Sequence, residues 1–215
     1  MTIAKILLGL GLSAAALGAN AAVVSYDATS GPYSSNPGPG LVTNTFDGMV
    51  LPSGFADYGS NLAVLIAHPG DGSYAAQPPN DPTDFFSVGT THGQLSSASV
   101  NFGGYGVSYF GFYMGSPDNY NTVTLYSGNT VLLTLDGGQM AAAASMMGDG
   151  NQGNGFYMNF TSSIGITKVT FASSQDAFES DNHSYIAAVP EPETYAMMLA
   201  GLGLVGALAR RRKQS

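Results

Sequence analysis

The chain has 215 residues, of which 9% are charged and 44% are hydrophobic, and it contains no cysteine. The charge content is far below the roughly one quarter that is usual in soluble domains, while the hydrophobic content argues against a disordered chain. The lack of cysteine excludes a disulfide scaffold, a thiolate metal site and a cysteine nucleophile. The length suits one domain together with processing segments.

Residues 1–21 have the pattern of a secretory signal peptide. An early lysine precedes an apolar stretch from Ile6 to Leu17, and Ala19 and Ala21 form the small-x-small site after which signal peptidase cuts. This stretch is short for a helix that crosses a membrane, which needs about 20 residues. Cleavage is therefore favoured over a retained anchor, and the exported chain is predicted to begin at Ala22.

Residues 22–188 are predicted to form an all-β domain, an antiparallel β-sandwich of jelly-roll type. Short runs of apolar and β-branched residues alternate with turns rich in Gly, Asn, Asp, Pro and Ser, which is typical of strands and hairpins. The strand candidates are 46–51, 62–67, 85–88, 95–102, 107–114, 122–126, 130–135, 155–160, 166–171 and 177–187. This number of strands fits a two-sheet sandwich.

The connections are predicted from the lengths of the turns. We expect the strands between residues 107 and 135 to form a meander, and those between 155 and 171 to form a second hairpin. Residues 139–147 are the one helical candidate, and residues 28–40 and 68–84 are Pro- and Gly-rich loops.

Charge is distributed unevenly along the chain. Residues 22–189 hold 12 acidic residues and one basic residue, Lys168, for a net charge of −11. Such a domain repels phosphate, which excludes nucleic acid as a partner, and as a whole it is repelled by anionic lipid headgroups.

Neither a catalytic site nor a zinc site is predicted. The three histidines, His68, His92 and His183, are far apart in the sequence and are expected on the surface or in loops. Motifs of serine hydrolases, zinc proteases and phosphate-binding loops are missing. We therefore predict that the protein is not an enzyme and requires no cofactor or metal.

Calcium is the ion that the composition suits best. Three segments rich in carboxylate and amide oxygens, at residues 118–119, 149–155 and 176–182, offer ligands of the type that calcium prefers. Acidic turns are also the ordinary outcome in an acidic β protein, so both interpretations remain open at this point.

Tyrosines provide the candidate ligand surface. In a strand over residues 107–114, alternation places the phenylalanines inward and the tyrosines outward. The same alternation over the neighbouring strands gives an outward set of four, Tyr109, Tyr113, Tyr126 and Tyr157. A row of tyrosines suits stacking on sugar rings, although tyrosine also simply favours strands.

Residues 189–215 consist of three parts. Pro190, Glu191 and Pro192 precede an apolar helix predicted at about 193–209, and a basic end at 210–213 follows, with Arg210, Arg211 and Arg212. The helix would be about 25 Å long, against a hydrocarbon core of about 30 Å, and arginine snorkelling closes the difference. A single transmembrane helix with the basic end in the cytoplasm is predicted.

This tail resembles the PEP-CTERM sorting signal, which an exosortase recognises in the membrane. The resemblance implies export from a Gram-negative bacterium, anchoring through the helix with the domain outside the cytoplasm, and then processing to the cell surface or extracellular matrix. Signal peptidase and exosortase are the implied processing enzymes. The alternative is a plain single-pass anchor without processing.

The middle of the domain is similar to a group of exosortase-dependent surface proteins. The similar segments are 109–122, 126–128 and 177–183. The two resemblances imply a structural or adhesive component associated with exopolysaccharide or biofilm. A carbohydrate-binding module is the main alternative, and a polysaccharide hydrolase is a further one.

Overall fold

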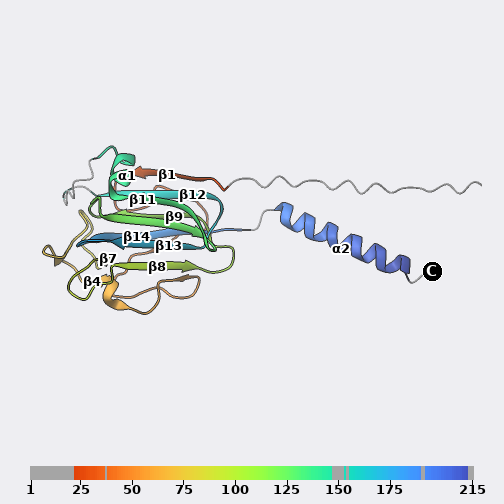
Figure 1. The fold of residues 1–215 in the computed structure, drawn as a ribbon, viewed down its shortest axis with the longest axis horizontal. Helices are drawn as coiled ribbons and strands as arrows, with labels where there is room; N and C mark the ends of the chain where they lie inside the picture. Colours follow the sequence, from red (N-terminus) through yellow and green to blue (C-terminus); the bar gives the residue numbers. More distant parts are fainter. Residues whose placement is uncertain (1–21, 37, 147–152, 154, 190–191, 213–215) are drawn as a thin grey trace, which may run out of the picture.

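The computed structural model describes residues 22–36, 38–146, 153, 155–189 and 192–212. These residues form a domain that is mostly β, in which two antiparallel sheets face each other, and a helix, α2, that follows the domain (Figure 1). The predicted signal peptide, with Ala19 and Ala21, lies outside the described residues.

The larger sheet has seven strands in the order β1-β12-β9-β14-β7-β4, and β2 also pairs with β14. Their bounds are β1 Val24–Thr29, β2 Val42–Asn44, β4 Leu65–Ile66, β7 Phe85–Val88, β9 Val107–Met114, β12 Phe156–Ile166 and β14 Phe178–Ala187. All pairings within this sheet are antiparallel.

The smaller sheet has five strands in the order β11-β10-β13-β8-β3. Their bounds are β3 Ala56–Asp57, β8 Ser97–Phe102, β10 Asn121–Ser127, β11 Thr130–Asp136 and β13 Lys168–Ser173. A separate two-stranded ribbon pairs β5 (Gly70–Asp71) with β6 (Ala75–Ala76), and a 3-10 turn, η1, covers Leu62–Val64.

The order of strands β7 to β14 confirms the jelly-roll prediction. The chain alternates between the sheets, with β7, β9, β12 and β14 in the larger one and β8, β10, β11 and β13 in the smaller one. Only the β10–β11 connection among these eight strands is a hairpin within one sheet. This is the double-sheet arrangement of a jelly roll.

Three local predictions are wrong for reasons that follow from this topology. The meander fails because the turn after Met114 carries the chain across the sandwich before β10 begins. The second hairpin fails because Thr167 alone connects β12 in one sheet to β13 in the other. Residues 46–51 form a turn rather than a strand, since Phe46 and Met49 both have positive φ values.

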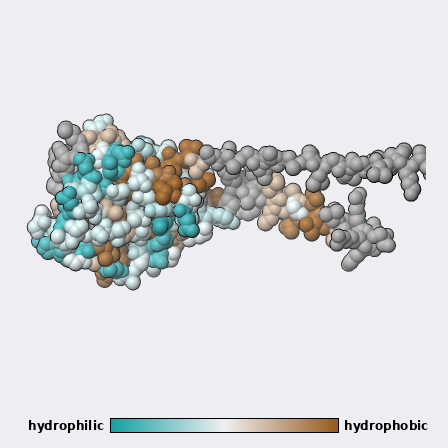
Figure 2. Space-filling model, in the orientation of Figure 1, coloured by the Kyte–Doolittle hydropathy of each residue, from teal (hydrophilic) through white to brown (hydrophobic). Residues whose placement is uncertain are grey.

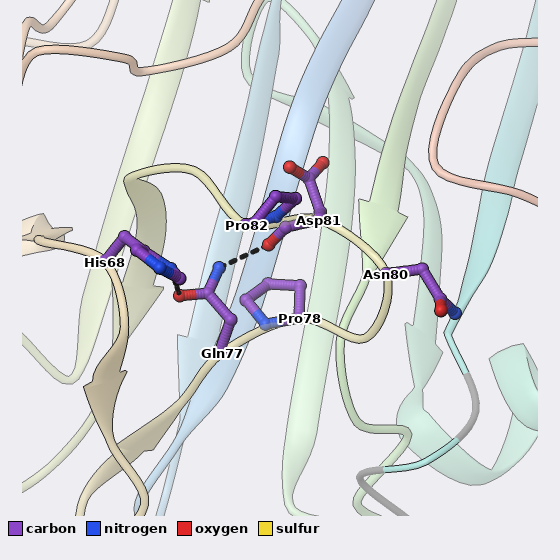
Figure 3. Close-up of a pocket in the computed structure, with 6 residues that line it drawn as sticks. All are labelled: His68, Gln77, Pro78, Asn80, Asp81 and Pro82. Carbon is purple, nitrogen blue, oxygen red and sulfur yellow. Dashed lines mark hydrogen bonds between the residues drawn. The ribbon is translucent and has the colours of Figure 1, made fainter.

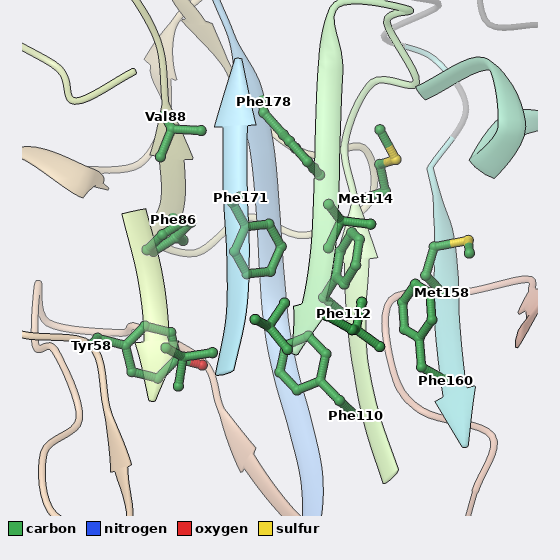
Figure 4. Close-up of a cluster of buried hydrophobic side chains, with 14 of the residues drawn as sticks. Tyr58, Phe86, Val88, Phe110, Phe112, Met114, Met158, Phe160, Phe171 and Phe178 are labelled. Carbon is green, nitrogen blue, oxygen red and sulfur yellow. The ribbon is translucent and has the colours of Figure 1, made fainter. Parts of the chain in front are cut away.

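Aromatic side chains from both sheets fill the interior (Figure 4). Phe86, Phe110 and Phe112 of the larger sheet contact Phe171 of the smaller one, with the Phe112 and Phe171 ring centroids 5.1 Å apart in an edge-to-face arrangement. Such geometry adds to the free energy gained from burial of apolar area. The core therefore lies between the sheets and is dominated by phenylalanine.

Helix α1 (Gly137–Ala143) corresponds to the short helix predicted near residues 139–147. It begins at Asp136, whose carboxylate accepts from the Gln139 amide at 2.8 Å, while the Gln139 side chain accepts from the Asp136 amide at 2.9 Å. This reciprocal capping box satisfies two backbone donors at the start of the helix. The acidic segment predicted at 149–155 lies mostly outside the described residues.

Helix α2 (Pro192–Arg212) occupies the place of the predicted apolar helix. In the described part of the chain, however, no helix is both long and apolar enough to cross a membrane, so the predicted transmembrane helix is not supported. The uninterrupted apolar stretch runs only from residue 196 to 209, or about 21 Å of helix against a hydrocarbon core of about 30 Å.

Candidate functional site

The tyrosines predicted to form an exposed ligand face are largely buried. Alternation along β9 separates the tyrosines from the phenylalanines as expected, but Tyr109, Tyr113 and Tyr157 are only 3%, 1% and 0% exposed. Tyr126 is half-buried and lies in the other sheet, where the Lys168 ammonium sits 3.9 Å from its ring centroid. The prediction of an exposed tyrosine row is therefore wrong.

Two Pro- and Gly-rich loops cover this face of the larger sheet. From the first loop, Ser34 shares a hydrogen bond of 2.6 Å with the Tyr109 hydroxyl, which in turn donates to the Asn159 amide oxygen at 2.7 Å. From the second loop, the carbonyl of Pro79 accepts from the Tyr113 hydroxyl. Since buried hydroxyls require partners, the tyrosines hold the loops onto the sheet.

Gly111 makes room for this tyrosine layer. A Cβ atom at this position would lie 2.6 Å from the Tyr109 hydroxyl and 2.6 Å from the Tyr157 ring, closer than real Cβ contacts allow. The Tyr157 hydroxyl donates to the Asn182 carbonyl at 2.8 Å. Glycine in β9 thus permits a second packed layer on the outer side of the sheet.

Strand β14 contains an irregularity that redirects its side chains. Its register against β9 shifts between Asp181 and Ser184, where Asn182 adopts a φ of 50°. Asparagine tolerates this left-handed conformation better than most residues. The extra residue reverses the alternation, so that His183 points into the core although simple alternation from Phe178 would point it outward.

His183 is buried at the centre of the sandwich, which corrects the prediction of a surface or loop position. It is 0% exposed, and its ring stacks on Phe171 with the centroids 4.8 Å apart. Nδ1 lies 3.0 Å from the Tyr58 hydroxyl and Nε2 lies 2.9 Å from the Ser180 hydroxyl. Burial lowers the pKa of His183 to about 3, so the imidazole is neutral.

Two buried carboxyl groups precede His183 along β14, those of Glu179 and Asp181. Glu179 accepts from the Ala76 amide at 2.9 Å and from the Ser116 hydroxyl at 3.1 Å. Burial, partly offset by these hydrogen bonds, raises its pKa to about 7. Asp181 accepts from the Thr83 hydroxyl at 3.2 Å. Burial, with added repulsion from Asp81, raises the pKa of Asp181 to about 8.

Two of the three segments that are similar to exosortase-dependent surface proteins, 109–122 and 177–183, lie side by side. Ser180 pairs with Met114 across β14 and β9, and the Gly115 amide donates to the Glu179 carbonyl at 3.0 Å. The Asn121 side chain donates to the Ala177 carbonyl at 3.1 Å. These segments therefore form one buried polar network, and alternation alone gave no signal of it.

The acidic residues predicted as calcium ligands accept hydrogen bonds from protein groups, and Asp118 and Glu179 share the Ser116 hydroxyl. Asp176 accepts hydrogen bonds from the backbone and hydroxyl groups of Thr90 and Thr91. Asp118 accepts from the Ser116 hydroxyl at 2.9 Å. Within the described ranges, no group of three or more His, Asp or Glu side chains is arranged to hold a metal ion.

Two pockets open beside the loop that contains β5 and β6. The larger, of about 390 Å³, is shown in Figure 3 and is lined by His68, Gln77, Pro78, Asn80, Asp81 and Pro82. His68 Nδ1 lies 2.8 Å from Gln77 Oε1, and the Gln77 amide donates to the carbonyls of Asp81 and Thr83. The smaller, of about 180 Å³, has Glu179 among its lining residues.

The tail follows directly on the last strand. β14 ends at Ala187, and the Ala188 amide donates to the Gly106 carbonyl at 2.9 Å. Pro190 and Glu191 lie outside the described residues, Pro192 begins α2 and Arg212 ends it. The apolar side chains described in α2 are more than half exposed: Met197, Met198, Leu199, Leu202, Leu204 and Val205.

Comparison with protein families identifies this tail. Residues 188–213 match the family model of the PEP-CTERM protein-sorting motif. The chain carries a PEP-CTERM motif. No curated protein and no solved structure gives a significant match to the chain.

The PEP-CTERM motif starts where the sheet ends. Its first residue, Ala188, is still hydrogen-bonded to the β9 end of the domain, and its apolar helix presents exposed side chains. Arg210 is exposed near the end of the helix, and Arg211 and Arg212 complete it. The described part of the motif thus continues directly from the domain and carries exposed apolar side chains.

Proposed function

We propose that the processed domain serves as a structural or adhesive component of the extracellular matrix, associated with exopolysaccharide. The PEP-CTERM motif supports export to the surface and sorting by an exosortase. The observation that carries the proposal is the matched motif attached, without a long linker, to a small acidic β-sandwich. The sequence of this chain resembles those of other proteins with this tail. The association of those proteins with exopolysaccharide supports the proposal by analogy.

A non-catalytic role is part of the same proposal. The carboxyl groups whose pKa values are most raised, Glu179 and Asp181, are 2% and 0% exposed and accept hydrogen bonds from the loops that cover them. Their arrangement supports a role in fixing those loops on the sheet. We also infer that no cofactor or calcium is needed, and expect a chelator to leave the unfolding midpoint unchanged.

The mass of the mature protein in envelope and medium tests the sorting step. We expect a species that begins at Ala22 and ends near Pro190–Glu193. Replacing Arg210, Arg211 and Arg212 by glutamine should leave the tail uncut, since the basic end of the motif is lost. The matched control replaces the same three arginines by lysine, which keeps the positive charge of the basic end. A wild-type chain that keeps its tail to Ser215 would contradict exosortase processing.

Carbohydrate binding is a second candidate function. Its candidate site is the larger pocket, because the tyrosines predicted to bind sugars are largely buried. The pocket joins the exposed ring of Pro82 to the exposed polar side chains of His68 and Asn80. An apolar platform with a few polar groups is the pattern of small-ligand sites. We expect Asn80→Ala and His68→Ala to weaken binding in a glycan array, while Asn129→Ala, at an exposed turn, does not. Absence of any bound glycan would remove this candidate.

A further inference from the structure

One end of the sandwich is formed by turns that lie next to both chain termini of the domain. The Val23 amide donates to Ser163 at 3.0 Å, and a Cβ on Gly165 would touch the Tyr105 carbonyl. The Ala188 amide reaches Gly106, as described above. Five segments at or beside this end, 22–24, 103–106, 126–131, 162–168 and 186–189, are connected by such contacts and strand pairings.

This surface, which we call the apolar end, exposes large apolar side chains. It comprises Val23, Phe55, Tyr105, Val131, Ile164 and Val189, and Figure 2 shows apolar surface gathered at this end of the domain. Val23, Tyr105 and Val189 are 63%, 65% and 83% exposed. Contiguous exposed apolar surface marks an interaction site more often than scattered residues do.

Acidic and basic residues are distributed unevenly between the two ends of the sandwich. The five segments contain no acidic residue, and their one charged residue is Lys168; beside Phe55, Asp57 is an exposed carboxylate, opposite Asn101 of β8. Carboxylates gather at the opposite end, where β9, β11 and β14 meet the loops, at Asp71, Asp118, Asp136, Asp176 and Glu179. Salt screens charges that are more than about 10 Å apart, so the carboxylates at the far end oppose contact of the apolar end with a negatively charged surface only weakly.

A short connection keeps the apolar end close to the sorting helix. Only residues 188–191 separate β14 from α2. Four residues span at most about 14 Å even when fully extended. Whatever holds α2 therefore also lies next to Val189 and Tyr105.

We propose that the apolar end rests on the lipid headgroups of the membrane from which the domain is sorted, with the acidic end pointing away. This inference rests on the proposed delivery of α2 to a membrane-embedded exosortase. Tyrosine and lysine are residues that favour the membrane interface, and both face this end, at Tyr105 and Lys168. The contact orients the domain so that residues 188 and 189, where the chain leaves the sandwich, lie at the membrane surface.

Tryptophan fluorescence tests this orientation, because the chain contains no natural tryptophan. The full exported chain is prepared as Tyr105→Trp, at the apolar end, and as Tyr74→Trp, in the pocket at the acidic end. Each is mixed with vesicles of equimolar phosphatidylcholine and phosphatidylglycerol that carry a nitroxide on the headgroup. We expect several-fold stronger quenching for Tyr105→Trp, together with a blue shift, while both variants float equally with the vesicles.

Acidic substitutions in the apolar end distinguish its contact with the membrane from the contact made by α2. Adding Val23→Asp and Ile164→Asp to Tyr105→Trp should abolish the extra quenching but leave flotation through α2 intact, since both side chains are exposed. Equal quenching at the two ends, no quenching in chains that float, or failure to float would each overturn the inference. The vesicles contain no exosortase, so failure of the proposed function is recognised separately, by an uncut tail in cells.

Discussion

His183 links the stability of the domain to pH because its imidazole is neutral in the folded state. Its folded pKa of about 3 lies below the ordinary value of 6.5. As pH falls from 6.5 towards 3, the unfolded chain takes up a proton that the folded chain does not, so this residue makes the domain less stable. The hydrogen bonds to Tyr58 and Ser180 are formed with the neutral ring.

We expect His183→Phe to lower the free energy of unfolding by about 2–3 kcal/mol at pH 7, because two buried hydroxyls lose their partner. The loss should shrink as pH falls from 6.5 to 4, since phenylalanine takes up no proton. Urea unfolding at pH 6.5 and pH 4 measures it, with His68→Phe, at an exposed position without a positive φ, as the control. A loss that is independent of pH would show that His183 does not carry the titration.

Asp181 makes the domain less stable as pH rises, whereas His183 makes it less stable as pH falls. Its folded pKa of about 8 lies above the ordinary 3.8, so the stability that its bound proton contributes is lost as pH rises from about 4 to 8. Asp181→Asn should therefore be more stable than the parent at pH 8, by about 2–4 kcal/mol, with little gain near pH 4. Asp57→Asn, at an exposed position, is the control. Equal gains at both pH values would contradict a raised pKa.

At the scale of elements, the irregularity in β14 decides which face each polar residue occupies. Asn182 combines a φ of 50° with an amide that donates to the buried Asp81 carboxylate. Glycine accepts that φ but lacks the amide, whereas valine lacks the amide and is strained there as well.

We expect Asn182→Gly to lower the free energy of unfolding by about 1–2 kcal/mol and Asn182→Val to lower it by about 1–2 kcal/mol more. Chemical unfolding of the two variants side by side gives the difference. Thr161→Val, at an exposed position in strand β12 of the same sheet, serves as a control for valine in this sheet. If valine is tolerated as well as glycine at residue 182, the left-handed conformation does not fix the strand.

Much of this element structure could be predicted from the sequence, because alternation and turn residues are local signals. Strands at 85–88, 107–114 and 130–135 lie where they were expected. The burial of Tyr109 could not be predicted, since it depends on a loop about 75 residues away in the chain. The inward position of His183 could not be predicted either, because one extra residue reverses the alternation without a sequence signal.

At the scale of the whole molecule, the domain and its PEP-CTERM motif are physically separable. Strand pairing ends at Ala187, and the last backbone contact described for the domain is that of Ala188 with Gly106. The apolar side chains described in α2 are exposed rather than packed on a sheet. The free energy of folding of the domain therefore comes from contacts within the sandwich, while the motif acts in sorting.

Removing residues 190–215 should consequently leave the unfolding midpoint unchanged and release the domain into the medium. The fold persists because every sheet pairing is retained, and release follows because the apolar helix that the exosortase recognises is gone. Thermal unfolding and immunoblots of envelope and medium measure the two effects. A control chain truncated at residue 177 loses β14 from the centre of the larger sheet and should not fold. If the chain lacking 190–215 folds but stays with the envelope, a surface other than the motif holds it there.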